Sequence, residues 1–559
     1  MLSLAYLAIV TTLSHYKLLW LDELITFHIA QLGSVTAIWN ALAHAADPNP
    51  PLTHFAVLAS MRLFGSSELA LRLPSILGYW TALLSLFLFL RRYVPVTWAV
   101  TGVLFSMANA AFDYSYESRS YAMMYGFTML ALLCWREAID PLASIARHRL
   151  ALCGMTLALA LGVSTNYFAV LAFLPIAGGE VARTFFRWRR GAAKEIDLSI
   201  WLALTIAITP LLAFHPLIER SIAQFAPHAW NKVSLDQVCD AYLQMVEVIL
   251  FPTLALLLLA GYLAVVSRHE SKMPQRPQWI KRLVQHHGEE VLERHEAVAV
   301  FLLMAYPFLG YLVARLHGGM LSPRFVIPVC LGFSIAGTLA AFRIFGRLQH
   351  AGAISLALVA CVFMGRVATV AHDYREQRQT FAQVLNDLPQ AAAGLPHADK
   401  PIVVADPLMV LTLQHYAPPA VASRIVFPVD FPAIRSLRGE DSPEENLWAG
   451  RNTIYHLPIV PLADLQKNTA DYVILASDNN WLVRDLATHS YPINRLPFRF
   501  PTETIEGFTP LNHADPVLYL SAGDRAARTN RCPEPTRFLA RANLPDAPMR
   551  RFPSSIAHR

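Results

Sequence analysis

Charged residues are scarce in this sequence. Lys, Arg, Asp and Glu make up 15% of its 559 residues, whereas soluble domains average about 25%. Apolar residues supply 55% of the chain, and the mean hydropathy is +0.37. This composition excludes a single large soluble core and indicates a membrane protein.

Cysteine is also rare and forms no CxxC pair. The six cysteines, five of them within or beside apolar runs, are Cys134, Cys153, Cys239, Cys330, Cys361 and Cys532. This pattern favours small buried residues over a zinc site or a disulfide framework. The first apolar run has neither a basic segment before it nor an A-x-A site after it, which argues against a cleaved signal peptide.

Long apolar runs fill the first two thirds of the chain. A bilayer core about 30 Å thick takes about 20 helical residues at about 1.5 Å each. The sequence therefore predicts a mainly α-helical, polytopic domain over 1–371. Its eleven expected spans are 1–19, 71–90, 95–112, 119–136, 149–164, 166–183, 198–216, 241–266, 297–316, 325–342 and 351–371.

Basic residues alternate between the loops. Eighteen Lys and Arg fall in one set of loops and five in the other. The rich set is expected to be cytoplasmic, so the other set and the chain after the last span face outside. The first outer loop, 20–70, contains apolar positions that suit helices lying on the membrane, and its stretch 52–64 is expected to be interfacial or re-entrant.

The chain beyond residue 371 has a different pattern. Strands are expected at 401–406, 472–476 and 517–520, with helices at 407–417 and 480–488, which predicts an extracytoplasmic α/β domain over 372–532. It contains neither GxGxxG nor a Walker A motif, so nothing supports nucleotide binding there. The tail, 533–559, is rich in Pro and Arg and is expected to be loosely ordered.

Adjacent carboxylates follow the first apolar run. Asp22 and Glu23 lie where a chain leaving the bilayer meets water. Desolvation and mutual repulsion tend to raise the pKa of one member of such a pair, which suits a general base. Taken alone, the pair is more simply explained as part of a solvated loop.

Two further outer segments contain charged residues that a membrane protein rarely places there. The first has Glu117, Arg119 and Tyr121 among several aromatic residues. An interfacial aromatic belt explains the tyrosines but not the charges. The second opens a span with Arg324, whose partner is either a phosphate or one of these carboxylates.

Other polar residues on this face are weaker candidates. Asn166 and Tyr167 lie in the third outer turn and are expected to line the same cavity. Histidines near this face, including His54, have no spacing that makes a metal box, so we predict no metal ligands.

Together these stretches resemble the GT-C glycosyltransferases, and in particular glycosyltransferase family 39, with its protein O-mannosyltransferases and bacterial aminoarabinose transferases. The resemblance covers about residues 1–370. The matching stretches are Asp22-Glu23, Asn49-Pro50-Pro51-Leu52, Phe64-Gly65-Ser66-Ser67-Glu68, Arg72-Leu73-Pro74-Ser75, Glu117-Ser118-Arg119-Ser120-Tyr121 and Arg324-Phe325.

The resemblance implies a glycosyltransferase of the bacterial cell envelope that uses a polyprenyl-phosphate sugar donor. Asp22 would be the general base in an inverting transfer to a lipid, glycan or protein hydroxyl, with Glu23 as its support. Arg119 and Arg324 would hold the phosphate, organised by Glu117. No cofactor or metal is implied. The site would face the periplasm from the inner membrane.

The remaining expected substrate-binding residues are Tyr121, Asn49, His54, Asn166 and Tyr167.

The sequence also departs from the family pattern. Asn49 replaces a Lys of the aminoarabinose transferases, Asn166 replaces a His of many mannosyltransferases, and Phe325 replaces a frequent Tyr. The C-terminal domain does not resemble the β-trefoil of eukaryotic mannosyltransferases. We therefore transfer neither acceptor to this chain.

Two alternatives belong to other classes. A transporter or flippase of polyprenyl-linked glycans should show internal repeats and broken helices at the membrane midplane, and the sequence has no clear repeat. A non-catalytic envelope subunit would use its C-terminal domain for binding and would tolerate loss of the acidic pair.

Overall fold

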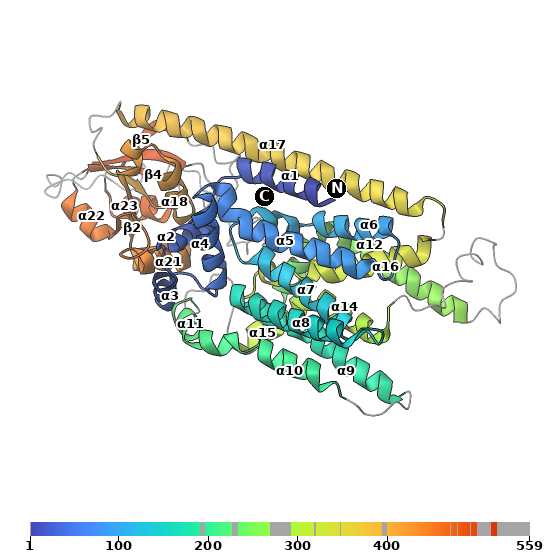
Figure 1. The fold of residues 1–559 in the computed structure, drawn as a ribbon. Coiled ribbons are helices and arrows are strands. Elements are labelled where there is room, and N and C mark those ends of the chain that lie inside the picture. Colours follow the sequence, from blue (N-terminus) through green and yellow to red (C-terminus); the bar gives the residue numbers. More distant parts are fainter. Residues whose placement is uncertain are drawn as a thin grey trace. The chain divides into compact units, whose positions relative to one another are not determined.

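A computed structural model describes most of the chain as two units, Met1–Arg375 and Glu376–Arg559 (Figure 1). The described residues are 2–189, 196–225, 233–268, 292–317, 320–346, 348–393, 400–469, 471–477, 479–491, 493–499 and 516–522. The predicted tail 533–559 and Cys532 lie outside these ranges.

The first unit is helical, as the sequence predicts. Its elements are α1 (Leu2–Tyr16), α2 (Leu21–Gln31), α3 (Val35–Ala43), α4 (Leu52–Phe64), α5 (Glu68–Leu90), α6 (Val96–Met107), η1 (Ala110–Tyr116), α7 (Tyr121–Ala138), α8 (Ile145–Thr165), η2 (Tyr167–Ala172), α9 (Phe173–Arg189), α10 (Leu198–Ala207), α11 (Pro210–Phe225), α12 (Asp236–Arg268), α14 (Arg294–Met304), α15 (Tyr306–His317), η5 (Pro323–Val326) and α16 (Val329–Phe345). The last helix, α17 (Ala351–Ala393), continues into the second unit.

Six helices in the described part of the chain are long and apolar enough to cross a membrane: Glu68–Leu90, Ile145–Thr165, Tyr167–Arg189, Leu198–Phe225, Asp236–Leu263 and Ala351–Gln383. Two bent pairs, α1 with α2 and α14 with α15, raise this number to eight if each is one span. A membrane protein is thereby confirmed, with six to eight candidate spans.

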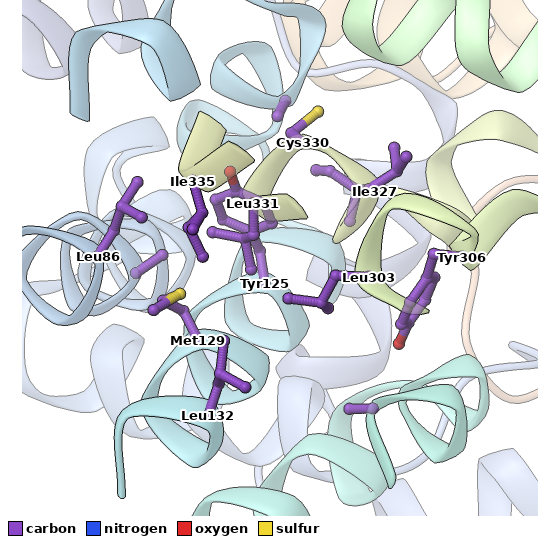
Figure 2. Packing of buried hydrophobic residues seen from close by; sticks show 14 of the residues in the cluster. Leu86, Tyr125, Met129, Leu132, Leu303, Tyr306, Ile327, Cys330, Leu331 and Ile335 are labelled. Carbon is purple, nitrogen blue, oxygen red and sulfur yellow. The ribbon is translucent and has the colours of Figure 1, made fainter. Parts of the chain in front are cut away.

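The other three predicted spans, 95–112, 119–136 and 325–342, contain α6, α7 and α16, which are not among these candidates. α6 and α16 are only 12 and 17 residues long. All three helices are largely buried inside the unit. Figure 2 shows Tyr125 and Met129 of α7 beside Leu331 and Ile335 of α16 in this core.

A close helix crossing joins α5 and α7. A Cβ on Gly78 would lie 2.6 Å from the Cα of Met123, and a Cβ on Gly126 would collide with the carbonyl oxygen of Gly78. Only glycine allows the two backbones to approach this closely. The crossing matters for the site because Arg72 lies near the start of α5 and Tyr121 begins α7.

Gly126→Ala is therefore expected to destabilise the protein by about 1–3 kcal/mol through overpacking. Thermal unfolding in detergent micelles would measure the loss as a lower midpoint. Gly261→Ala on α12 is the matched control, because nothing lies within 4 Å of its added Cβ. Equal midpoints for the two variants would contradict the close crossing.

The second unit contains a six-stranded sheet in the order β3-β2-β1-β4-β6-β5. The strands are β1 (Ile402–Val404), β2 (Ile425–Val429), β3 (Ile459–Pro461), β4 (Asp471–Ser477), β5 (Ile493–Arg499) and β6 (Pro516–Ala522). The first four run parallel, and β6 pairs antiparallel with both β4 and β5. The strands predicted at 401–406, 472–476 and 517–520 are confirmed.

Helices form the connections between most strands of this sheet. They are α18 (Pro407–Tyr416), α19 (Pro419–Ala422), α20 (Phe431–Arg438), α21 (Ser442–Gly450), α22 (Leu462–Asn468) and α23 (Trp481–Thr488). The Asp406 and Asn480 side chains cap α18 and α23, the two helices that the sequence predicts. Side-chain caps of this kind fix where a helix begins after a strand.

Candidate active site

A sharp corner between α1 and α2 positions the acidic pair. The two helices meet at 94°, and Asp22 and Glu23 lie in the first turn of α2. Arg72 of α5 holds this corner through hydrogen bonds of 2.8 Å from Nε and Nη2 to the two carboxylate oxygens of Glu23. Both side chains are fully buried.

Arg72 also holds the end of α1. Its Nη1 donates to the carbonyl oxygens of Ser14 and Lys17 at 2.7 and 2.9 Å. Carbonyls at the end of a helix have no partner within that helix, and this guanidinium satisfies these two. Glu23 additionally accepts from the backbone N–H of Ser118 at 2.7 Å. With its oxygens occupied, Glu23 positions the corner and its neighbour Asp22.

Asp22 is held by two arginines from distant parts of the sequence. Its Oδ2 accepts from Nη1 of Arg324 at 2.9 Å and lies 3.7 Å from Nε of Arg119. The Asp22 side chain is 17% exposed, in contrast to Glu23. The sequence left a phosphate or a carboxylate as the partner of Arg324, and in the structure Arg324 pairs with the Asp22 carboxylate. The Arg324 guanidinium also lies 5.5 Å from the ring centre of Tyr121.

A second carboxylate, Asp47, was not predicted. Its Oδ2 accepts from Nη1 of Arg119 at 2.7 Å, and its Oδ1 accepts from the backbone N–H of Asn49 at 2.8 Å. Burial alone would raise the pKa of Asp47, but the Arg119 guanidinium and neighbouring His54 outweigh it and hold the pKa below its usual range. Asp47 is therefore an anion in the site.

Arg119 joins the two carboxylates. Besides Asp47 it contacts Asp22 at both the side chain and the backbone oxygen, and Nη1 donates to Oγ1 of Thr26 at 3.1 Å. Burial would lower the pKa of Arg119, but Asp47 and Asp22 overcome this and raise it. The guanidinium is thus a fixed positive charge between the two acids.

Neutral polar side chains lie next to Asp47 and hydrogen-bond to one another. Asn166 donates from Nδ2 to Oγ of Ser120 at 3.0 Å and to Oδ1 of Asn49 at 3.4 Å. Asn166 also separates α8 from η2, because its side chain accepts from the backbone N–H of Phe168. The predicted residues Asn49 and Asn166 therefore lie together, although they come from different loops.

Glu117 has a different partner from the one expected. Its Oε1 accepts from Nζ of Lys17 at 2.6 Å, and Lys17 lies over the rings of Tyr116 and Tyr374. Burial raises the pKa of Glu117, and Lys17 opposes this shift. Glu117 therefore ties the loop before α7 to the end of α1, and its contact with Lys17 does not involve Arg119 or Arg324.

The fold is similar to that of a solved membrane protein. ArnT from Cupriavidus metallidurans, solved with undecaprenyl phosphate bound, aligns with a TM-score of 0.54 at 14% identity, over 93% of this chain and 97% of that one. The Archaeoglobus fulgidus oligosaccharyltransferase, solved with Zn and sulfate, gives a TM-score of 0.43 at 11% identity, over 84% and 67% of the two chains. The ArnT alignment shows that this chain has an ArnT-like fold.

A sequence match covers part of the first unit. Residues 48–218 match the family described as dolichyl-phosphate-mannose-protein mannosyltransferase, and no curated protein matches the chain. This segment contains the loops of Asn49, Arg119 and Asn166. The match favours an enzyme over the transporter and the non-catalytic subunit.

Proposed function

We propose that the protein transfers a sugar from a polyprenyl-phosphate donor to a hydroxyl group of an envelope lipid, glycan or protein. The family name refers to a dolichyl-phosphate sugar, and the ArnT structure contains undecaprenyl phosphate. The single observation that carries the proposal is the convergence of Arg324 and Arg119 on Asp22.

The reaction is a single displacement at the anomeric carbon. Asp22 takes the proton of the acceptor hydroxyl while that oxygen forms its bond to C1. The bond from C1 to the phosphate oxygen breaks, and its electron pair leaves with polyprenyl phosphate. Arg324 and Arg119 stabilise the charge that grows on the phosphate, and attack opposite the leaving group inverts the anomeric centre.

Donor binding also activates the base in this scheme. Without donor, the Oδ2 of Asp22 is occupied by the N–H of Arg324 at 2.9 Å. A donor phosphate attracts the same guanidinium group, since a guanidinium binds phosphate through two parallel hydrogen bonds. As Arg324 turns to the phosphate, Asp22 becomes free to accept a proton.

We further propose that α6, α7 and α16 cross the membrane, which gives the eleven spans predicted from the sequence. Their burial among other helices supports this, because a helix shielded from lipid needs less apolar surface than an exposed one. With eleven spans, the candidate site and the α/β domain face the periplasm of a bacterial inner membrane, as the basic loops predict.

Arg324→Gln is expected to weaken binding of decaprenyl phosphate about tenfold or more, because it removes a charge-assisted contact to the phosphate. Thermophoresis of the full chain in lipid nanodiscs would measure the affinity. Arg324→Lys should fall between wild type and Gln, since Lys keeps the charge without the fork. The control is Arg315→Gln at an exposed position on α15. Unchanged affinity in Arg324→Gln would refute the phosphate contact.

A further inference from the structure

A group of polar side chains beside the base has unused hydrogen-bonding capacity. We call it the Asp47 cluster, and its members are Asp47, Asn49, His54, Ser120, Asn166 and Tyr167. Arg119 links this cluster to Asp22, since it contacts both carboxylates. A ligand group held here therefore lies next to the reacting centre that the proposed function assigns to Asp22.

His54 is the member least satisfied by the protein. Its side chain is 1% exposed, and neither ring nitrogen has a hydrogen-bond partner among the described residues. Proteins pair nearly all buried polar groups with protein, water or ligand. An imidazole buried in this way at the edge of an active site is therefore placed to bind something else.

The separation of His54 and Asp47 suits a bridging oxygen atom. Nε2 of His54 lies 3.8 Å from Oδ2 of Asp47, which is too long for a direct hydrogen bond, whereas an oxygen about 2.8 Å from both atoms would bridge them. A hydroxyl can donate to the carboxylate and accept from the imidazole N–H at the same time. Asp47 and His54 thus form a matched pair of partners for a single hydroxyl group.

The charge of the cluster selects the class of ligand. Arg119, which contacts the cluster, is already paired with Asp47 at 2.7 Å. A phosphate in the cluster would be repelled by the Asp47 carboxylate and would compete with it for Arg119. The neutral members, including the two carboxamides, suit a ligand with several hydroxyl groups. Tyr167 adds a buried phenol oxygen that is unpartnered within the described ranges.

We propose that His54 and Asp47 clamp one hydroxyl of a sugar ring, which makes His54 a specificity-determining residue. This rests on the proposed function, because the sugar belongs either to the lipid-linked donor or to a glycan acceptor. The clamp orients the ring against Asp22 through Arg119. Sugars that lack this hydroxyl, or present it on the other face of the ring, bind more weakly.

The test compares sugar-bearing and plain lipid on the full chain in nanodiscs. The donor probes are decaprenyl phosphate alone and decaprenyl phosphate linked to mannose, glucose or arabinose. The acceptor probes are the methyl glycosides of the same sugars, added to protein loaded with decaprenyl phosphate. Wild type is expected to prefer at least one sugar-bearing probe, and His54→Phe is expected to lower that preference about tenfold.

Two amide variants keep the experiment interpretable if His54→Phe folds poorly. His54→Gln places a polar atom near the former Nε2 and should retain the preference, whereas His54→Asn reaches only the Nδ1 position and should lose it. His215→Gln is the control for replacing a histidine, because His215 is 66% exposed on α11. If His54 had only a structural role, His54→Gln and His54→Asn would show the same sugar preference.

Each outcome is decisive. If His54→Phe and His54→Asn lose the sugar preference only with the donor probes, or only with the methyl glycosides, the clamp is supported and the source of the sugar is identified. Equal sugar preference in wild type, His54→Asn and His54→Phe overturns the clamp. A water molecule bridging His54 and Asp47 would then explain their separation. Failure of wild type to bind plain decaprenyl phosphate instead contradicts the proposed function, so the two failures are distinguishable.

Discussion

Asp22→Asn is expected to lower the rate of sugar transfer by about 10²–10⁴-fold, the usual contribution of a general base. The amide has nearly the same size but cannot accept the acceptor proton, and Asp22 reaches the partly exposed side of the α1–α2 corner. The rate is measured as consumption of a decaprenyl-phosphate sugar by the reconstituted chain, with an envelope extract as the source of acceptor.

The change should affect chemistry more than folding or donor binding. Asp22→Asn removes a charge that competes with phosphate for Arg324, so affinity for decaprenyl phosphate should be maintained or increased. Asp140→Asn is the matched control, because Asp140 pairs with Arg92 in the loop after α7, which is predicted to be cytoplasmic. A wild-type transfer rate in Asp22→Asn would remove Asp22 from the mechanism.

The second large effect is expected at Arg72. Arg72→Met leaves the Glu23 carboxylate buried without its bidentate partner and leaves the carbonyls at the end of α1 unsatisfied. Breaking a buried ion pair from one side typically costs about 3–5 kcal/mol. We therefore expect a strongly lowered unfolding midpoint and low yield of folded protein, measured by thermal unfolding in detergent. Arg62→Met is the control at an exposed position of α4.

A double-mutant cycle separates the ion pair from simple loss of packing. Glu23→Gln combined with Arg72→Met should cost much less than the sum of the two single changes, since the two groups contact each other. Additive losses would mean that the pair does not hold the corner. The cycle also tests whether Glu23 is a positioning residue. If it is, Glu23→Gln should lower stability more than Asp22→Asn does.

The sequence predicts most of the helices because apolar length is a local property. The runs at 149–164 and 166–183 are confirmed as α8 and the η2–α9 helix, with Asn166 at the junction. In the α/β domain, β2 and β3 were missed because they are short and contain Pro428 and Pro461, and proline weakens a strand pattern.

The candidate site could be assigned to one side of the membrane from the sequence, but its pairings could not. Arg324 and Asp22 are 302 residues apart, and Lys17 and Glu117 are 100 apart. Charge and membrane topology narrow the set of residues that can pair, but they do not identify which residues contact each other. Asp47 was overlooked as a site residue because acidic residues are common in proline-rich loops, and only the fold brings it to Arg119. The catalytic and binding roles themselves stay predictions.

The most direct test is a structure of the full chain in nanodiscs with decaprenyl phosphate. The account predicts the phosphate within hydrogen-bond distance of the Arg324 guanidinium, with the contact between Arg324 and Asp22 opened and the Asp22 carboxylate facing the space beside the phosphate. A phosphate bound away from Arg324 and Arg119, with the Arg324–Asp22 pair intact, would contradict it.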